Sequence, residues 1–195
     1  MDREFPPLSV AALKNGAQLS QPVQGVLKRL DVEAPAVRIM TDLTLVPAAT
    51  IEPSRSIDEA NDAMIRRGVR LLFVMRADQR LAGLVTATDI LGDKPVRLAV
   101  ERGIPRRELV VSDIMIPEEL LEAIDFQTIL TSKIGHVVTT LKSLGRQHAL
   151  VVERAAGGDF VRGILSATQI ARSLGITLEP GEISRSFAEI EAALR

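Results

Sequence analysis

An internal repeat constrains this chain more than any other feature of its sequence. The segment at residues 83–90, GLVTATDI, recurs 80 positions later at residues 163–170 as GILSATQI. A second matching pair precedes it, with GVRLLFV at residues 68–74 and GRQHALV at residues 145–151. Because both pairs occur in the same order, we expect the chain to fold as two copies of one structural unit.

Each copy is predicted to contain a strand, a helix, two strands and a second helix, in that order. In the first copy, residues 45–51 are a short strand candidate, and Ser56 with Glu59 form a capping box at the start of a helix. Gly68 is suited to end that helix in the left-handed conformation. The continuous apolar run at residues 71–75 and the pattern at residues 81–85 then predict a hairpin.

The second copy follows the same plan. An apolar stripe predicts a helix from Ile134 to Leu144, which Gly145 ends. Strands are expected at residues 149–152 and 160–165, and Ser166 with Gln169 form a capping box at the start of the last helix of the repeat.

The repeats divide the chain into four parts. They are an N-terminal extension (residues 1–40), a first repeat with a connecting helix (41–105), a second repeat (106–175) and a C-terminal amphipathic helix (176–195). In the extension, residues 10–14 form a short helix candidate. The C-terminal helix is predicted at residues 182–194, where Ile183, Phe187, Ile190 and Leu194 share one side.

Composition excludes several classes of protein. The 195 residues include no cysteine, which excludes disulfide scaffolds, thiolate metal sites and cysteine nucleophiles. The net charge of −1 and the aromatic content of 3% argue against nucleic-acid binding. No apolar run is long enough to span a membrane, and the first residues lack the pattern of a signal peptide. We therefore expect a cytoplasmic protein.

The repeated segments resemble the signature of cystathionine-β-synthase (CBS) domains arranged as a tandem pair, which is also called a Bateman module. The resemblance rests on residues 83–90, their variant at residues 163–170, and VSDIMIP at residues 111–117. It implies an α/β (α+β) fold in which two β-α-β-β-α repeats pack sheet to sheet with pseudo-twofold symmetry. It also implies a stand-alone, homodimeric regulatory protein that is not an enzyme and that binds an adenine nucleotide (AMP, ADP or ATP) between its repeats.

A nucleotide site needs an apolar slot for the base, an acceptor for the ribose diol and donors for the phosphates. The resemblance places the carboxylate of Asp89 at the ribose position. Thr86 lies where a strand meets a helix, so its hydroxyl and the following amides can face an anion. The remaining candidates are Ile51, Leu72 and Leu84 as walls for the base, and Arg70 and His148 as phosphate contacts.

Two interpretations of these residues remain open. Gln169 replaces the carboxylate in the second copy, so we expect one standard nucleotide site, centred on Asp89. Alternatively, Thr86 and Asp89 only cap a helix, and the chain is a dimerising or docking protein without a small ligand. Neither interpretation requires a cofactor, a metal or catalytic residues, and the acidic residues Glu118, Glu119 and Glu122 are explained by the helix dipole. Both leave the regulated partner open.

Overall fold

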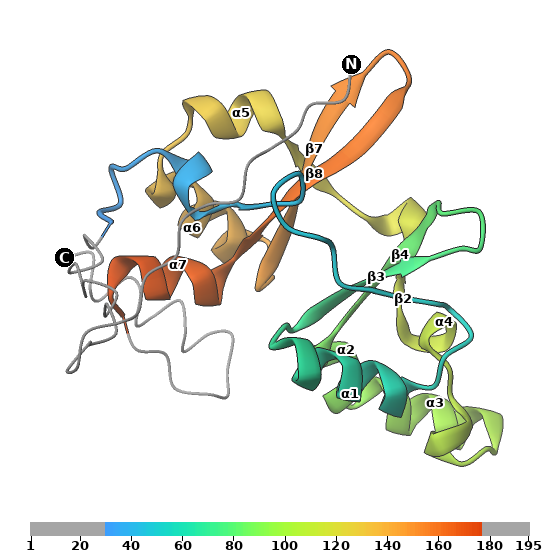
Figure 1. The fold of residues 1–195 in the computed structure, drawn as a ribbon. Helices are drawn as coiled ribbons and strands as arrows, with labels where there is room; N and C mark the ends of the chain where they lie inside the picture. The colour runs from blue at the N-terminus through green and yellow to red at the C-terminus, as the bar shows by residue number, and fades with distance from the viewer. Residues whose placement is uncertain (1–29, 177–195) are drawn as a thin grey trace, which may run out of the picture.

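The computed structural model of the chain describes residues 30–176 (Figure 1). The helices predicted at residues 10–14 and 182–194 lie outside this range. Within it, the chain forms two four-stranded sheets in a mixed arrangement of helices and strands. The α/β (α+β) class and the repeated architecture are therefore confirmed.

The first unit is built on a sheet with the strand order β2-β3-β4-β5. Its strands are β2 (Thr50–Ile51), β3 (Leu71–Met75), β4 (Leu81–Thr86) and β5 (Ile116–Pro117). Its helices are α1 (Ile57–Arg67), α2 (Ala87–Leu91), α3 (Lys94–Arg102), the 3-10 helix η2 (Arg106–Glu108) and α4 (Val111–Ile114). As predicted, β3 and β4 pair in antiparallel fashion as a hairpin.

The second unit has the matching strand order β1-β8-β7-β6. Its strands are β1 (Thr41–Asp42), β6 (Ala123–Asp125), β7 (His148–Ala155) and β8 (Gly158–Ser166). Its helices are α5 (Phe126–Thr131), α6 (Ile134–Ser143), α7 (Ala167–Leu174) and the 3-10 helix η1 (Ala36–Ile39), while η3 (Glu118–Leu120) lies between the units in sequence. In both sheets an antiparallel hairpin is flanked by a parallel strand and a short antiparallel strand.

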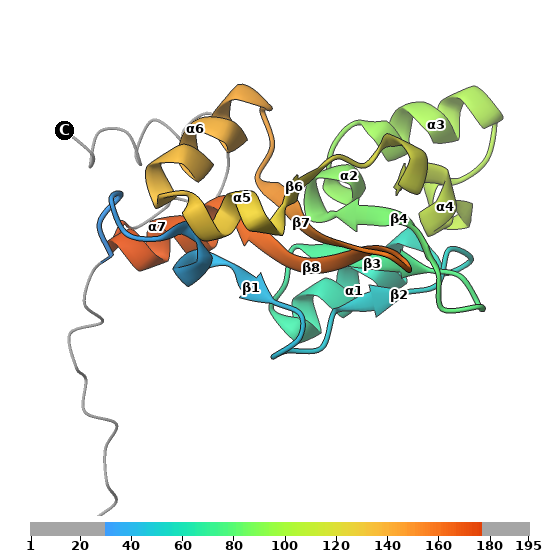
Figure 2. The ribbon, with the colours of Figure 1, turned by 90° about the horizontal axis from the view of Figure 1, so that it is seen from above.

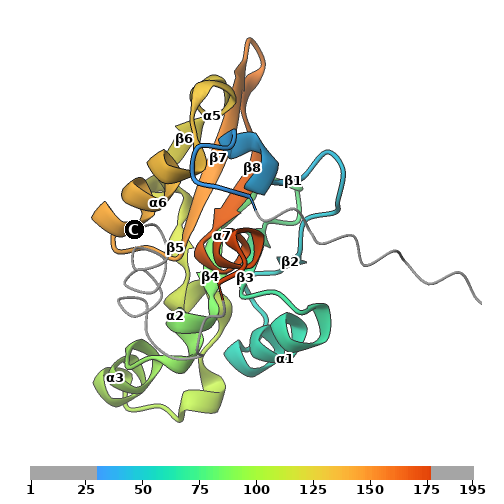
Figure 3. The ribbon, with the colours of Figure 1, turned by 90° about the vertical axis from the view of Figure 1, so that its left-hand side faces the viewer.

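The two sheets pack against each other. Leu71, Phe73 and Leu84 of the first sheet form a buried cluster with Leu150 of the second. Figure 2 shows the sheets meeting where β7 and β8 approach β3 and β4. Each unit also has its own core between its sheet and its helices. Figure 3 shows α1 and α3 at one end of the molecule and α5 at the other.

The short edge strands are exchanged between the units. β1 precedes the first repeat's helix in sequence, yet it pairs with β8 of the second unit, with Asp42 opposite Gly163. In the same way, β5 precedes the second repeat's helix but pairs with β4 of the first unit, with Pro117 opposite Gly83. Residues of η1 and α4 follow the same exchange, because each packs into the core of the other unit. The packing units therefore differ from the intervals 41–105 and 106–175 along the sequence.

Most local predictions agree with the structure. Ser56 and Glu59 form the predicted capping box, and Gly68 ends α1 at φ 63°. The strand predicted at residues 45–51 is wrong except for its last two residues. Asp42 accepts a hydrogen bond from the Thr44 amide and its carbonyl accepts from the next two amides, so the chain turns, and Leu45 is 81% exposed.

The capping box predicted at Ser166 and Gln169 is also wrong. α7 begins where predicted, but its Ser166 N-cap makes no side-chain capping hydrogen bond. The backbone of Ser166 (φ −131°, ψ 131°) differs from that of Thr86 (φ −112°, ψ 163°), which does form a capping box. The hydroxyl of Ser166 is thus not engaged in capping, and this distinguishes the two repeats.

Two glycines permit the exchanged strands to approach. A Cβ atom on Gly83 would lie 2.2 Å from the carbonyl oxygen of Ile116 in β5. A Cβ atom on Gly163 would lie 2.6 Å from the sulfur of Met40 and 2.8 Å from the carbonyl oxygen of Thr41. These glycines open the two repeated segments found in the sequence, so steric contact explains why the pattern begins with glycine in both copies.

We expect Gly83→Ala to lower the free energy of unfolding by about 2 to 3 kcal/mol, because the added methyl group meets backbone atoms that have to separate. For a chain of this size the loss corresponds to a Tm decrease of roughly 5–10 °C. The matched control is Gly157→Ala in the β7–β8 turn, where an added Cβ has no neighbour within 4 Å. Thermal denaturation of both variants tests the exchange, and equal Tm values would contradict it.

An ion-pair network fastens β1 to the second unit. The Arg162 guanidinium donates to both carboxylate oxygens of Asp42, from Nε and Nη2, at 3.0 Å each. Its Nη1 donates to Glu153 at 2.9 Å, and the guanidinium lies 4.6 Å from the ring centre of Phe126. The Arg162 hydrogen bonds, together with those from Thr44, hold the pKa of the Asp42 carboxyl well below its usual range.

This network predicts a loss of stability in acid. Because the pKa of Asp42 is lower in the folded state, its contribution is fully present above the unfolded value near 4 and is lost as the pH falls below it. We expect Asp42→Asn to be less stable than the wild type at pH 7 and to lose less stability between pH 5 and pH 3. Urea denaturation at these pH values measures both effects, with Asp159→Asn in the β7–β8 hairpin as the control. Identical pH profiles for Asp42→Asn and the wild type would contradict the role of this pair.

Candidate ligand clefts between the repeats

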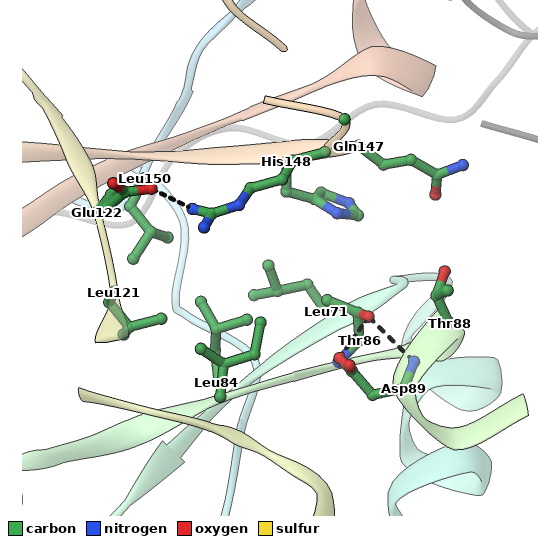
Figure 4. A pocket seen from close by; sticks show the side chains of 13 residues that line it. Leu71, Leu84, Thr86, Thr88, Asp89, Leu121, Glu122, Gln147, His148 and Leu150 are labelled. Atoms are coloured by element: carbon green, nitrogen blue, oxygen red, sulfur yellow. Dashed lines mark hydrogen bonds and ion pairs between the residues drawn. The ribbon is translucent and has the colours of Figure 1, made fainter. Parts of the chain in front are cut away.

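Two clefts lie where the repeats meet. The first, with a volume of about 210 Å³, lies between the start of α2 in the first unit and the start of β7 in the second (Figure 4). The residues that line it are Leu71, Leu84, Thr86, Thr88, Asp89, Ile116, Leu121, Glu122, Gly145, Arg146, Gln147, His148 and Leu150. The second cleft, of about 390 Å³, is formed by the corresponding segments with the roles of the repeats exchanged.

One end of the first cleft is apolar. Leu71 and Leu84 come from β3 and β4, Leu150 comes from β7, and Leu121 follows η3. Figure 4 shows Leu84, Leu121 and Leu150 at the end of the cleft away from Thr88, with Leu71 between them and Thr86. Such a surface can take the flat face of an aromatic or heterocyclic group, because burial of apolar area is favourable on both sides of the contact.

The other end begins with a capping box at α2. The Asp89 carboxylate accepts from the Thr86 amide at 2.8 Å and from the Thr86 hydroxyl at 2.6 Å, both through Oδ2. The Thr86 hydroxyl in turn accepts from the Asp89 amide at 3.3 Å. Among residues 30–176, no group donates a hydrogen bond to Oδ1 of Asp89. This oxygen keeps its lone pairs for a ligand with neighbouring hydroxyl groups.

Arg146 and His148 of the second repeat line the same cleft. His148 opens β7, and Figure 4 shows its ring above Leu71 and Thr86. Arg146 forms an ion pair with Glu122 at 3.0 Å, but both side chains are well exposed. Exposed ion pairs contribute little to stability, so Arg146 can exchange this partner for a ligand at low cost.

His148 is neutral at physiological pH. Burial lowers the pKa of its imidazole to about 4, and the positive charge of the nearby Arg70 adds to this effect. A neutral imidazole can donate one hydrogen bond and accept another. An anion placed next to it would favour the protonated form and raise its pKa.

The structure separates the predicted site residues into three groups. Thr86, Asp89, Leu84 and His148 line the first cleft together. Arg70 lines the second cleft, which His148 and Leu71 also border. Leu72 and Ile51 line neither cleft and belong to the core between the first sheet and its helices, where Leu72 is fully buried.

The misplacement of Leu72 follows from strand geometry. Successive side chains of a strand face opposite sides, so in β3 Leu71 and Phe73 face the second unit while Leu72 and Val74 face the helices. Because all five residues of β3 are apolar, the sequence of this strand does not reveal which side chains face the helices and which face the second unit. The repeat itself carries the missing signal, since its alignment places His148 at the position of Leu71 rather than of Leu72.

Sequence reasoning also missed Arg146, Gln147, Leu121 and Leu150. Arg146 and Gln147 lie between the glycine that ends the α6 segment and the start of β7, where no local pattern marks a ligand contact. Leu121 follows a short 3-10 helix and reaches the cleft only because β5 joins the first sheet. These positions depend on contacts that are distant in sequence.

Two further findings concern the part of the chain that the structure describes. No group of three or more histidine, aspartate or glutamate side chains there is arranged to hold a metal ion. No helix in the same range has the length and apolar character needed to cross a membrane.

Comparison with known proteins agrees with this fold. Residues 36–93 match the family model of the CBS domain. An uncharacterized conserved protein from Pyrococcus horikoshii is 23% identical, with a TM-score of 0.54 over 78% of this chain and all of the other. CBSX2 from Arabidopsis thaliana, solved in complex with AMP, is 21% identical, with a TM-score of 0.50 over 72% of this chain and 95% of the other.

A third similar structure is the CBS-domain containing protein ATU1752 from Agrobacterium tumefaciens. It is 19% identical, with a TM-score of 0.50 over 67% of this chain and 88% of the other. At these identities the likeness concerns the fold, and it extends over both repeats. Residues 36–93 therefore match the CBS domain, and the chain over both repeats shares the fold of CBS-domain proteins.

Proposed function

We propose that the first cleft binds an adenine nucleotide and that the chain is a regulatory module rather than an enzyme. The observation that carries this proposal is the position of Asp89. Its Oδ2 is held by Thr86, its Oδ1 accepts no hydrogen bond within residues 30–176, and its side chain lines a cleft that is apolar at one end and also lined by Arg146 and His148. This arrangement provides, within one cleft, the three kinds of contact that a nucleotide needs.

Each part of a nucleotide has a matching group. The two lone pairs of Asp89 Oδ1 can accept from both hydroxyls of a ribose, as acidic residues do in other nucleotide-binding folds. The base would lie against Leu84 and Leu121, and the phosphate would accept hydrogen bonds from Arg146. The cleft is small, which favours a mononucleotide over a dinucleotide. The AMP complex of CBSX2, which shares the fold, supports a ligand of this class.

A bound nucleotide would contact both repeats at once. Asp89 belongs to the first unit and Arg146 to the second. A ligand that contacts both residues stabilises the arrangement of the repeats in which both contacts can form. Occupancy can therefore shift the equilibrium between arrangements of the two repeats. A partner protein or a second copy of the chain that contacts both units would sense this shift.

One observation favours the alternative, a dimerising or docking protein that binds no small ligand. Leu91 of α2 and Val100 of α3 are 68% and 77% exposed, and Ile65 of α1 is 69% exposed. Exposed apolar side chains on neighbouring helices are typical of surfaces that contact another protein. In this interpretation Asp89 acts only as a helix cap.

Calorimetric titration with AMP separates the two interpretations. We expect the wild type to bind AMP and the Asp89→Ala variant to bind it at least tenfold more weakly, because the diol loses its acceptor. At an AMP concentration of 100 times the Kd, the wild type gains about 2.7 kcal/mol, which raises the Tm by about 5 °C or more.

The matched control is Glu59→Ala. This change removes the same kind of capping box from α1, whose capping residues Ser56 and Glu59 line neither cleft, so it reproduces the structural loss without touching the ligand. AMP affinity should remain at the wild-type value in this control. If the wild type binds none of AMP, ADP and ATP, the docking interpretation replaces the nucleotide site.

The proposal also predicts a dependence of AMP affinity on pH. In the protein without ligand, the pKa of the His148 imidazole is about 4. A phosphate close to this ring would raise that pKa, so binding takes up a proton. The charged groups around this ring are Arg70 before β3, Asp89 on α2, Arg146 and its partner Glu122, and Arg172 on α7.

We therefore expect the affinity of the wild type, relative to that of His148→Gln, to increase as the pH falls from 7 to 5. The phosphate of AMP also takes up a proton in this interval, but it does so for both proteins, so the ratio of their affinities isolates the imidazole. Titrations at three pH values measure this ratio. A ratio that stays constant would show that the phosphate does not approach His148.

A further inference from the structure

We propose that a groove beside the edge strand β2 docks an extended acidic segment of a partner protein, which adds a strand to the first sheet. This inference goes beyond the proposed function, because the groove shares no lining residue with either cleft. It concerns the chemistry of a partner, which the nucleotide proposal leaves open. It rests on the open backbone edge of β2 and on the charge of the residues around it.

The groove has a volume of about 960 Å³ and lies between β2, α1 and the turn that follows β3. Figure 2 shows β2 and α1 on one side of the first unit, away from α3 and α4. The residues that line the groove are Thr50, Ile51, Glu52, Pro53, Ser54, Arg55, Glu59, Ala63, Arg66, Arg67, Met75, Arg76, Ala77 and Gln79.

The backbone of β2 has an open edge toward this groove. β2 comes first in the strand order β2-β3-β4-β5, so within the described part of the chain it pairs with β3 alone. The register places Thr50 opposite Phe73, and the Phe73 amide donates to the Ala49 carbonyl. In a parallel ladder of this register, Ala49 and Ile51 bond to β3, so the amide and carbonyl of Thr50 point away from the sheet. Such an edge is a template for an added strand.

The charged side chains of the groove carry a positive excess. Arg55 lies 3.4 Å from Glu52 and 3.3 Å from Glu59, so one arginine serves both carboxylates that line the groove. Arg66 and Arg67, in contrast, make no ion pair or hydrogen bond within residues 30–176. Their charge attracts carboxylates and repels the same groove of a second copy of the chain.

The repeat shows that the fold does not need these two arginines. The alignment of the two copies puts Ser143 and Leu144 at the positions of Arg66 and Arg67. The corresponding helix of the second unit, α6, ends at Ser143 without them. The positive charge is therefore a property of this groove and not of the architecture.

The geometry of a strand defines the pattern of the docked segment. Alternate side chains of a strand share one face and lie roughly 7 Å apart. On the face toward α1 they meet Ala63, Arg66 and Arg67, so acidic residues at alternate positions suit the two guanidinium groups. Ile51 and Met75, both partly buried, supply apolar contact for the residues between them.

A peptide fits these features better than a nucleic acid does. Single-stranded nucleic acids stack their bases on aromatic side chains, and none of the residues that line the groove is aromatic. A peptide strand, in contrast, supplies the amides and carbonyls that match the open edge of β2.

The test measures, by fluorescence anisotropy, how the full chain binds a synthetic peptide of about eight alternating glutamate and valine residues. We expect Arg66→Gln and Arg67→Gln to weaken binding about threefold each and about tenfold together, because each removes an exposed charge contact. Both side chains are exposed, so the variants should unfold close to the wild-type Tm. Arg97→Gln, which removes an exposed charge of α3 outside the groove, is the matched control and should bind as the wild type does.

A second pair of variants tests the addition of a strand. Thr50→Pro removes the amide that points away from β3 and leaves the bonds between β2 and β3 in place. We expect it to weaken peptide binding about fivefold. Thr50→Val keeps the amide and should bind as the wild type does. Equal affinities of these two variants would show that charge alone holds the peptide, which overturns strand addition.

Three further outcomes would overturn the proposal. The first is no binding of the glutamate–valine peptide by the wild type at low salt. The second is equal binding of a lysine–valine peptide of the same length. The third is tighter binding of a single-stranded oligothymidylate, which would identify a nucleic-acid surface. None of the substituted residues lines the first cleft, so this proposal and the nucleotide site at Asp89 fail independently.

Discussion

The exchange of short edge strands is the constraint on which the rest of this structure depends. β1 completes the sheet of the second unit and β5 completes that of the first, so neither repeat has a whole sheet without the other. The exchange is possible because Gly83 and Gly163 allow close backbone approach. It also builds the clefts. The residues next to each exchanged strand lie beside the junction between a strand and a helix of the other repeat, and the two groups of residues line one cleft.

Within this frame the two repeats have diverged at the start of the second helix. Thr86 and Asp89 hold each other, and the carboxylate still has one oxygen that accepts no hydrogen bond within residues 30–176. Ser166 and Gln169 do not make the corresponding capping interaction. Helix capping and ligand recognition thus depend on the same two positions of the repeat. α7 begins at the position that corresponds to the start of α2, although it has no capping box. A substitution at these positions can therefore alter the chemistry of a cleft and leave the fold intact.

The sequence was sufficient for the order of the elements, the α1 cap and the glycine at its end, because these features depend on neighbouring residues. It was not sufficient for features that depend on contacts between residues distant in sequence. Because every residue of β3 is apolar, the sequence did not indicate that Leu72 faces the helices. Most of the strand expected at residues 45–51 is replaced by a turn at Asp42, which Arg162 stabilises. Of the predicted site residues, Asp89, Thr86, Leu84 and His148 line one cleft. Arg146 lines it too, but the sequence did not indicate this residue because its neighbours in the cleft come from the other repeat.

The position of His148 gives the two clefts a common element. His148 and Leu71 line both clefts. A phosphate in the first cleft that favours the protonated form of this ring would therefore also change the charge along the second cleft. The shared residue thus makes the chemistry of one cleft depend on what the other contains, which two separate clefts would not do.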